Sequence, residues 1–267
     1  MGRQMVFVGH AHALRAAIVA CSLVLFGPGV GAATLQTSGL LQLGTGPAEP
    51  FGLPVTRIYW GGILAKWLGV LQRLDDERVQ LALCDGDREH CASDAALQFL
   101  AIVDNARQRD GRARLGEINR AVNLAIHPMS DLAQFGEIDV WSSPLVTFYR
   151  GAGDCEDYAI AKYVALRMAG IPPEDLRIVV MTDLLRGEGH AVAAVRLDGH
   201  RLMLDNRRMA MMEDVAIRNY RPLFVIDQFG VKKYSDAPLL VHMQGQDPIP
   251  AAGLNPTGLS RAVAVSN

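Results

Sequence analysis

The sequence has few cysteines, few aromatic residues and no internal repeat, and these absences exclude several classes of protein. Four cysteines occur in 267 residues, and aromatic residues make up 6% of the chain. Basic residues are scattered, and no stripe of basic and aromatic side chains is present, so the sequence argues against a nucleic-acid-binding protein. Half of the residues are hydrophobic, a fifth are charged and the formal net charge is −2. This composition is typical of a globular protein with one substantial domain or two small ones.

Acidic residues are also missing from the start of the chain. Arg3 and Arg15 are followed by an apolar stretch over residues 16–26 and then by small residues up to Ala33. A basic region, an apolar region and a zone of small residues in this order indicate a secretory signal peptide cleaved near Ala32 or Ala33. An uncleaved anchor is the alternative, but the apolar stretch is short for a bilayer. We therefore expect residues 1–32 to be a signal peptide and the mature protein to be periplasmic.

Three cysteines remain after the predicted signal peptide, and an odd count leaves one thiol over. Cys84 and Cys91 are close in sequence, with turn-forming residues between them. A disulfide that closes this loop is the favoured interpretation in an oxidising compartment. Two unpaired thiols, or a metal site that includes His90, are the alternatives. The disulfide would leave Cys155 as the free thiol.

The hydrophobic pattern changes along the chain from a helical period to a strand period. Helices are predicted at 60–83, 95–107, 113–126 and 155–169, and strands at 176–181, 191–197, 200–204, 223–226 and 231–234. Asp198 and Gly199 form the turn of a hairpin between the second and third of these strands. Helices followed by an antiparallel sheet predict an α+β fold.

Composition also divides the chain into segments. Residues 33–54 are rich in Gly, Thr, Ser and Pro and are predicted to be a flexible lead-in. Residues 55–235 form the predicted folded domain. Residues 236–267 lose periodicity and are predicted to be a C-terminal tail that is mobile at its end.

The most informative segment contains Cys155, which follows two glycines at the start of a predicted helix. A cysteine at this place is exposed to unpaired backbone amides and the positive end of the helix dipole, which favour the thiolate. His190 and Asp205 follow in the predicted hairpin. Pairing across its turn places residue 207 opposite His190 and puts Asp205 one step away on the same face. Nucleophile, base and orienting carboxylate therefore occur in the order that a cysteine-based catalytic triad needs.

Three carboxylates, Asp154, Glu156 and Asp157, surround this thiol in the sequence. Acidic residues suit a helix N-terminus, but one would suffice for that purpose. Three of them repel one another and oppose thiolate formation at Cys155. A hard cation bound by oxygen ligands would relieve both effects, and calcium accepts irregular carboxylate clusters. The sequence therefore predicts a Ca²⁺ site formed by these three acids.

The chain resembles a known family at these positions. The similarity includes Gly153-Asp154-Cys155-Glu156-Asp157-Tyr158-Ala159, His190-Ala191-Val192 and Leu204-Asp205-Asn206-Arg207, and it continues upstream at residues 116–123 and 139–144. These motifs resemble the bacterial transglutaminase-like cysteine proteinases of the LapG type over roughly residues 55–235.

The resemblance implies a papain-like, transglutaminase-type fold and a calcium-dependent periplasmic protease. Members of the family cleave a large surface adhesin near its N-terminus, beside a pair of alanines, and so release cells from a biofilm. A LapD-type inner-membrane receptor that senses cyclic di-GMP holds them inactive. By this resemblance Cys155, His190 and Asp205 are the triad, and Asp154 and Glu156 belong to the calcium site. Asp157 is added from the charge argument.

Two other functions remain open at this point. A transglutaminase-type acyl transferase would use the same triad, with an amine in place of water resolving the thioester. A non-catalytic adaptor that binds the receptor would keep only the fold. Trp141 has two interpretations as well: a wall of the substrate cleft, or a core aromatic, which is favoured.

Overall fold

The structure, a computed structural model, describes residues 49–235. The predicted signal peptide, most of the predicted lead-in and the predicted C-terminal tail lie outside the described residues. The helices come first, apart from the short strands among them: α1 (Gly62–Gly86), α2 (Asp94–Arg107), α3 (Gly111–Ala125), β2 (His127–Pro128), α4 (Asp131–Phe135), α5 (Pro144–Arg150), β3 (Ala152–Gly153) and α6 (Cys155–Met168). A 3-10 turn, η1 (Pro50–Gly52), and the strand β1 (Val55–Arg57) precede them.

The main sheet has seven strands in the order β1-β9-β8-β4-β5-β6-β7, and all of its pairs are antiparallel. Most of it is built after α6, from η2 (Pro173–Asp175), β4 (Leu176–Asp183), β5 (Glu188–Leu197), β6 (His200–Leu204), β7 (Met212–Glu213), η3 (Asp214–Ala216), β8 (Tyr220–Asp227) and β9 (Gly230–Tyr234). The predicted α+β fold, with helices before an antiparallel sheet, is confirmed.

The predicted hairpin has the predicted register. Leu197 pairs with His200 and Ala193 with Leu204 across the turn between β5 and β6. Asp198 and Gly199 both have positive φ, 50° and 83°. Positive φ at both central residues is the conformation of a two-residue hairpin turn that matches the twist of the strands.

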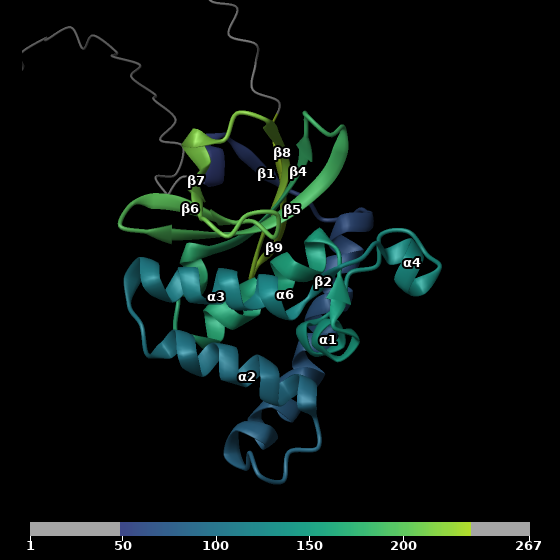
Figure 1. Ribbon diagram of the computed structural model, residues 1–267. Helices are drawn as coiled ribbons and strands as arrows, with labels where there is room; N and C mark the ends of the chain where they lie inside the picture. The colour runs from purple at the N-terminus through teal and green to yellow at the C-terminus, as the bar shows by residue number, and fades with distance from the viewer. Residues whose placement is uncertain (1–48, 236–267) are drawn as a thin grey trace, which may run out of the picture. The chain divides into compact units, whose positions relative to one another are not determined.

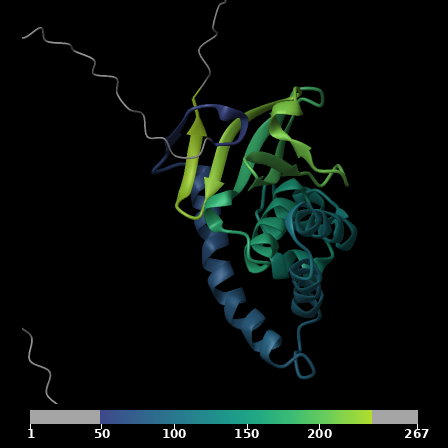
Figure 2. The same ribbon diagram turned by 90° about the vertical axis from the view of Figure 1, so that its left-hand side faces the viewer.

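Strand residues alternate between two cores because successive side chains point to opposite faces of a sheet. Ile178, Ala193 and Leu204 belong to the core shared with the helices. Val179 and Met203 belong to a smaller core on the other face, covered by residues from 51 to 55 and by Ile217. Figures 1 and 2 show the helices gathered on one face of the sheet, with α6 against β4 and β5.

The predicted helices form with good local signals. Ser93 caps α2 by accepting a hydrogen bond from the Ala96 amide at 3.2 Å, which satisfies one of the unpaired N–H groups of the first turn. Two short helices, α4 and α5, were not predicted, although α5 begins at Pro144, which suits a first helical turn. Both are too short to show a clear helical period.

The disulfide between Cys84 and Cys91 is present and joins the end of α1 to the segment before α2. Cys155 is the free cysteine within residues 49–235. At the other end of the domain, Glu49 forms ion pairs with Arg177 and Lys232, so the described part of the predicted lead-in is anchored to the sheet. No helix within residues 49–235 is long and apolar enough to cross a membrane.

Candidate active site

Cys155 is the first residue of α6, and the chain reaches it through a tight connection from α5. Gly151 ends α5 with φ of 64°, a left-handed conformation that favours glycine. Residues 152–153 then pair in parallel with β2. The half-buried Cys155 side chain is thereby placed at the N-terminus of a helix whose body packs on β5.

Gly153 has a different reason for being glycine. A Cβ atom there would lie 2.8 Å from Cβ of Asp157 and 3.2 Å from Cγ2 of Thr147. Its φ is not positive, so the requirement is space and not a turn. The absent side chain lets the start of α6 bring Asp157 close to the backbone, where its carboxylate accepts the Asp154 amide at 3.4 Å.

His190 and Asp205 form a buried pair. Nε2 of His190 lies 2.9 Å from Oδ1 of Asp205, and the two residues are 1% and 4% exposed. The Arg207 amide donates to the same oxygen at 2.9 Å, and the Tyr220 hydroxyl donates to Oδ2 at 2.9 Å. Burial alone would raise the pKa of Asp205, but these donors, His190 foremost, hold it below its ordinary range.

His190 and Cys155 line one cleft of about 850 Å³, and the backbone amide of Ala191, the neighbour of His190, interacts with the Cys155 sulfur. Nδ1 of His190 is buried and has no hydrogen-bond partner, whereas Nε2 is occupied by Asp205. One ring nitrogen is therefore held by a carboxylate and the other is free to exchange a proton with a group in the cleft.

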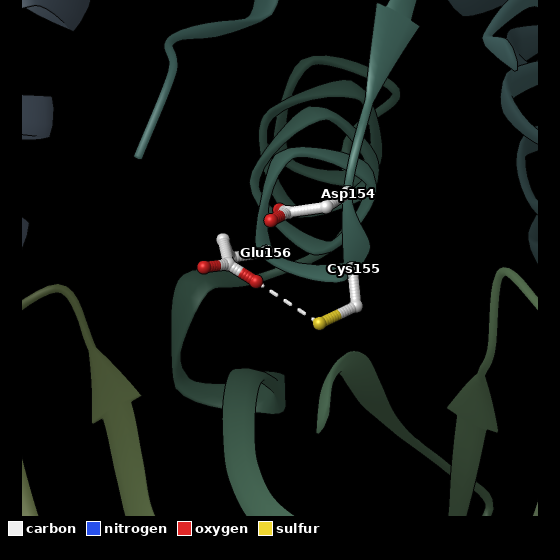
Figure 3. Close-up of side chains that lie close together, drawn as sticks. All are labelled: Asp154, Cys155 and Glu156. Carbon is white, nitrogen blue, oxygen red and sulfur yellow. Dashed lines mark hydrogen bonds between the residues drawn. The ribbon is translucent and has the colours of Figure 1, made fainter. Parts of the chain in front are cut away.

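The thiol itself is held in its neutral form. Figure 3 shows the carboxylate of Glu156 turned toward the sulfur of Cys155, with 2.9 Å between Sγ and Oε2. Burial raises the pKa of Cys155 first, and the negative charges of Glu156 and Asp154 raise it further. The Ala191 amide acts in the opposite direction but does not compensate. This arrangement suppresses the thiolate unless the nearby negative charge is neutralised.

Asp131 completes an acidic cluster with Asp154 and Asp157. Ligand atoms from these three residues lie within 4.8 Å of one another. Oδ1 of Asp131 and Oδ1 of Asp154 are both buried without a hydrogen-bond partner. Burial and the charges of Glu156, Asp157 and Asp131 raise the pKa of Asp154 to about 10, and burial raises that of Asp157 to about 7. Unpaired buried carboxylate oxygens at this spacing fit a cation with metal–oxygen distances of about 2.4 Å.

A second set of contacts continues the acidic region along the cleft. Asp139 forms an ion pair with Lys66 and accepts the indole N–H of Trp141 at 2.9 Å. Burial raises the pKa of Glu156, and a hydrogen bond with Asp139 adds to this. Trp141 is 6% exposed and packs in the helical core while one side lines the cleft. Both interpretations of Trp141 therefore describe part of its environment.

The sequence did not identify several residues of this site. Asp131, Asp139 and Tyr220 each lie in a different segment from Cys155. Asp139 begins the 139–144 motif of the family resemblance, but no role was predicted for it, and no local motif marks Asp131 or Tyr220. The unexpected short helix α4 carries Asp131, whose Oδ2 accepts the Val140 amide at 2.5 Å. Only the folded chain brings these residues together.

The chain is similar to one described family of proteins and to several solved structures. The sequence matches the profile of the family described as bacterial transglutaminase-like cysteine proteinase, BTLCP, over residues 79–223. No curated protein matches the chain. Among solved structures, calcium-bound LapG of Legionella pneumophila is similar with 23% identity and a TM-score of 0.47, covering 54% of this chain and 82% of that one. The EGTA-treated form has 22% identity and a TM-score of 0.49, covering 58% and 84%.

Proposed function

This chain belongs to the bacterial transglutaminase-like cysteine proteinases, and from that premise we propose that Cys155, His190 and Asp205 are the catalytic triad of a calcium-dependent endopeptidase. The family makes the chain a cysteine peptidase. The assignment of the three residues, the metal, the substrate and the regulation is the proposal.

One observation carries the assignment: the imidazole of His190 is fixed by Asp205 through Nε2 and its buried Nδ1 lacks a partner, while the cleft that His190 lines also holds Cys155, the only free thiol of residues 49–235. This is the division of roles that a cysteine nucleophile needs. The base accepts the thiol proton at Nδ1, and the carboxylate keeps the ring oriented and stabilises the imidazolium.

The chemistry follows from these positions. Cys155 transfers its proton to Nδ1 of His190 and attacks the carbonyl carbon of the scissile peptide. His190 returns the proton to the leaving amine, and a thioester to Cys155 remains. Water activated by the same imidazole then hydrolyses the thioester and regenerates the thiol. The unpaired amides of the first turn of α6 would stabilise the oxyanion in both steps.

Calcium is the proposed cofactor because the thiol and its acidic neighbours are incompatible in the metal-free state. Asp131, Asp154 and Asp157 supply hard oxygen ligands, two of which are otherwise unpaired. Glu156, which contacts both the Cys155 thiol and Asp139, is a further candidate ligand. A bound dication would supply positive charge that favours the thiolate. Calcium bound to LapG of Legionella pneumophila supports this choice of metal.

The substrate and the partners are proposed from the family resemblance. The substrate is a large surface adhesin cleaved near its N-terminus at an Ala-Ala site, which would release the adhesin and disperse a biofilm. The partner is the periplasmic domain of a LapD-type inner-membrane receptor for cyclic di-GMP. An enzyme that cleaves this adhesin and binds this receptor domain has to be in the periplasm, in agreement with the predicted signal peptide.

The test is cleavage of a purified adhesin N-terminal fragment that contains an Ala-Ala pair. Cys155→Ala should abolish cleavage and His190→Ala should reduce it nearly as far, by about four orders of magnitude or more, because the triad acts as a unit. Circular dichroism and thermal unfolding should show both variants folded. Full activity of a folded Cys155→Ala variant would refute the proposed mechanism.

The same assay separates the alternatives. An acyl transferase would attach an amine such as putrescine to the substrate, where a protease adds water, and mass spectrometry distinguishes the two products. A non-catalytic adaptor would leave the fragment intact with either acceptor. The complete set of Cys155, His190 and Asp205 favours an enzyme over the adaptor.

A further inference from the structure

Tyr220 contacts both members of the His190–Asp205 pair from a separate strand. It lies in β8, is 8% exposed and donates its hydroxyl proton to Oδ2 of Asp205 at 2.9 Å. Its ring lies 5.4 Å from the imidazole of His190, centroid to centroid, at an interplanar angle of 59°. One side chain therefore touches both the imidazole and the carboxylate that orients it.

The Asp205 carboxylate needs such a partner because its terminal torsion is soft. Oδ1 carries two bonds, one with His190 Nε2 and one from the Arg207 amide, whereas Oδ2 receives the Tyr220 hydroxyl. Removing that hydroxyl would take away the hydrogen bond that Tyr220 donates to the buried Oδ2 of Asp205. The carboxylate would then gain by rotating or by taking up a proton, and either change weakens its bond to the imidazole.

Tyr220 remains a donor across the working range of the enzyme. Burial raises the pKa of the Tyr220 hydroxyl to about 12, and the negative charge of Asp205 adds to the effect. The aromatic ring is also held in place, because Tyr220 belongs to the smaller core on the outer face of the sheet. The donor is therefore both protonated and rigidly placed.

We propose that Tyr220 is a positioning residue of the active site, which holds the Asp205 carboxylate so that Oδ1 faces Nε2 of His190. The inference rests on the proposed function, since it assigns to Tyr220 a role in the triad described above. Tyr220 acts through Asp205 and does not touch the reacting atoms.

Tyr220→Phe is the direct test because it removes the hydroxyl and keeps the ring. Tyr234→Phe is the matched control: Tyr234 is 3% exposed in the strand next to β8, and its hydroxyl donates one hydrogen bond, to the Pro50 carbonyl at 3.0 Å. The two variants lose the same chemical group from the same sheet. A general effect of losing a buried hydroxyl would appear equally in both.

The readout is the rate at which iodoacetamide alkylates Cys155 in full-length protein supplied with calcium, followed on the Cys155 peptide by mass spectrometry. We expect a decrease of about tenfold in Tyr220→Phe and no change in Tyr234→Phe. In an Asp205→Ala background, Tyr220→Phe should have no further effect, because a residue that acts through Asp205 has nothing left to position. The low-field proton resonance of the His190 ring, assigned by its loss in His190→Ala, should shift in Tyr220→Phe alone.

The outcomes separate this inference from the proposed function. If His190→Ala alkylates as fast as the unchanged protein, the Cys155–His190 pairing is wrong and the proposed function fails. If His190→Ala is slow and Tyr220→Phe is unaffected in rate and resonance, only the role of Tyr220 is overturned. Equal losses in Tyr220→Phe and Tyr234→Phe, or additive losses with Asp205→Ala, would likewise make the hydroxyl merely structural.

Discussion

Lys162 is a buried ionisable residue that interacts electrostatically with Asp205 of the active site. It lies in α6, is fully buried and donates to the Leu204 carbonyl at 3.0 Å, one residue before Asp205. Burial lowers the pKa of Lys162 to about 7, and the charge of Asp205 offsets only part of this effect. The unfolded chain keeps an ordinary lysine with a pKa near 10.5. Between these two values the unfolded state binds the extra proton.

Lys162 should therefore make the protein more stable as the pH rises from 7 to 10. The folded-state pKa is depressed, so the stability is lost as the pH falls toward 7, with a slope of up to about 1.4 kcal/mol per pH unit. Lys162→Met should remove this slope. The measurement is urea unfolding of both proteins at pH 7, 8 and 9, compared as the difference in unfolding free energy.

Lys233→Met provides the control for this prediction, because Lys233 is exposed on β9. It removes one positive charge without changing a buried group. If the difference in unfolding free energy between the unchanged protein and Lys162→Met stays constant with pH, Lys162 is already charged in the folded state.

At the scale of elements, the connection from α5 through β3 into α6 determines where the acidic cluster sits. Gly153→Ala would place a methyl group 2.8 Å from Cβ of Asp157, a distance that neighbouring atoms can relieve only by moving. We expect a loss of about 1–3 kcal/mol in stability and a weaker cation site. Gly69→Ala is the control: the nearest atom to its Cβ would be Arg73 Nη1 at 3.6 Å, so it should be neutral or stabilising as a helix substitution.

Denaturant unfolding and calcium titration calorimetry on both glycine variants test this expectation. Weak calcium binding in Gly153→Ala together with normal binding in Gly69→Ala would support the role of close approach at Asp157. Equal calcium affinity in the two variants would show that the start of α6 adjusts without disturbing the acids.

The disulfide between α1 and α2 belongs to the same scale. Cys84 and Cys91 are seven residues apart and close a short loop that does not line the cleft. Closing such a loop restricts the unfolded chain by about 2.5 kcal/mol. Cys84→Ala/Cys91→Ala should lower the unfolding free energy by about this amount, while peptidase activity at 25 °C stays unchanged. A large loss of activity in the folded double variant would contradict this prediction and show that the loop contributes to activity.

For the whole molecule, the acidic cluster should make stability depend jointly on pH and calcium. Without metal, the raised pKa values of Asp154 and Asp157 mean that the folded protein holds protons which the unfolded chain has released. This contribution is complete below the unfolded pKa, near 4, and is lost as the pH rises through 7 and above. We expect the melting temperature in EGTA to fall between pH 5 and pH 7. Calcium should restore the melting temperature, because it adds about 2.7 kcal/mol to the unfolding free energy at one hundred times its dissociation constant.

Asp154→Asn tests the cluster directly, since it should flatten the pH dependence in EGTA and abolish the gain from calcium. EGTA should also stop cleavage by the unchanged protein. Asp94→Ala is the control, because Asp94 is a first-turn acid of α2 outside the cluster. Undiminished cleavage in EGTA, with no calcium-dependent change in melting temperature, would leave Asp154, Glu156 and Asp157 as simple helix-terminus residues.

Local signals in the sequence are sufficient for much of the fold. Hydrophobic periods and the Asp198-Gly199 turn predict α2, α6 and the β5–β6 hairpin within a few residues of their observed limits. The hairpin register, which follows from a two-residue turn, also predicts that His190 and Asp205 meet. The family resemblance follows from the same short motifs, because they carry the chemistry in consecutive residues.

The tertiary structure alone decides the rest, because the deciding contacts join segments far apart in the chain. Asp131 reaches the acids of α6 only through the packing of α4, and Tyr220 reaches Asp205 only because β8 lies beside β4 in the sheet. The burial that shifts the pKa values of Cys155, Asp154 and Lys162 is likewise a property of the assembled core. The sequence by itself determined which side chains could react. The fold decided how deeply those side chains are buried and which distant residues contact them.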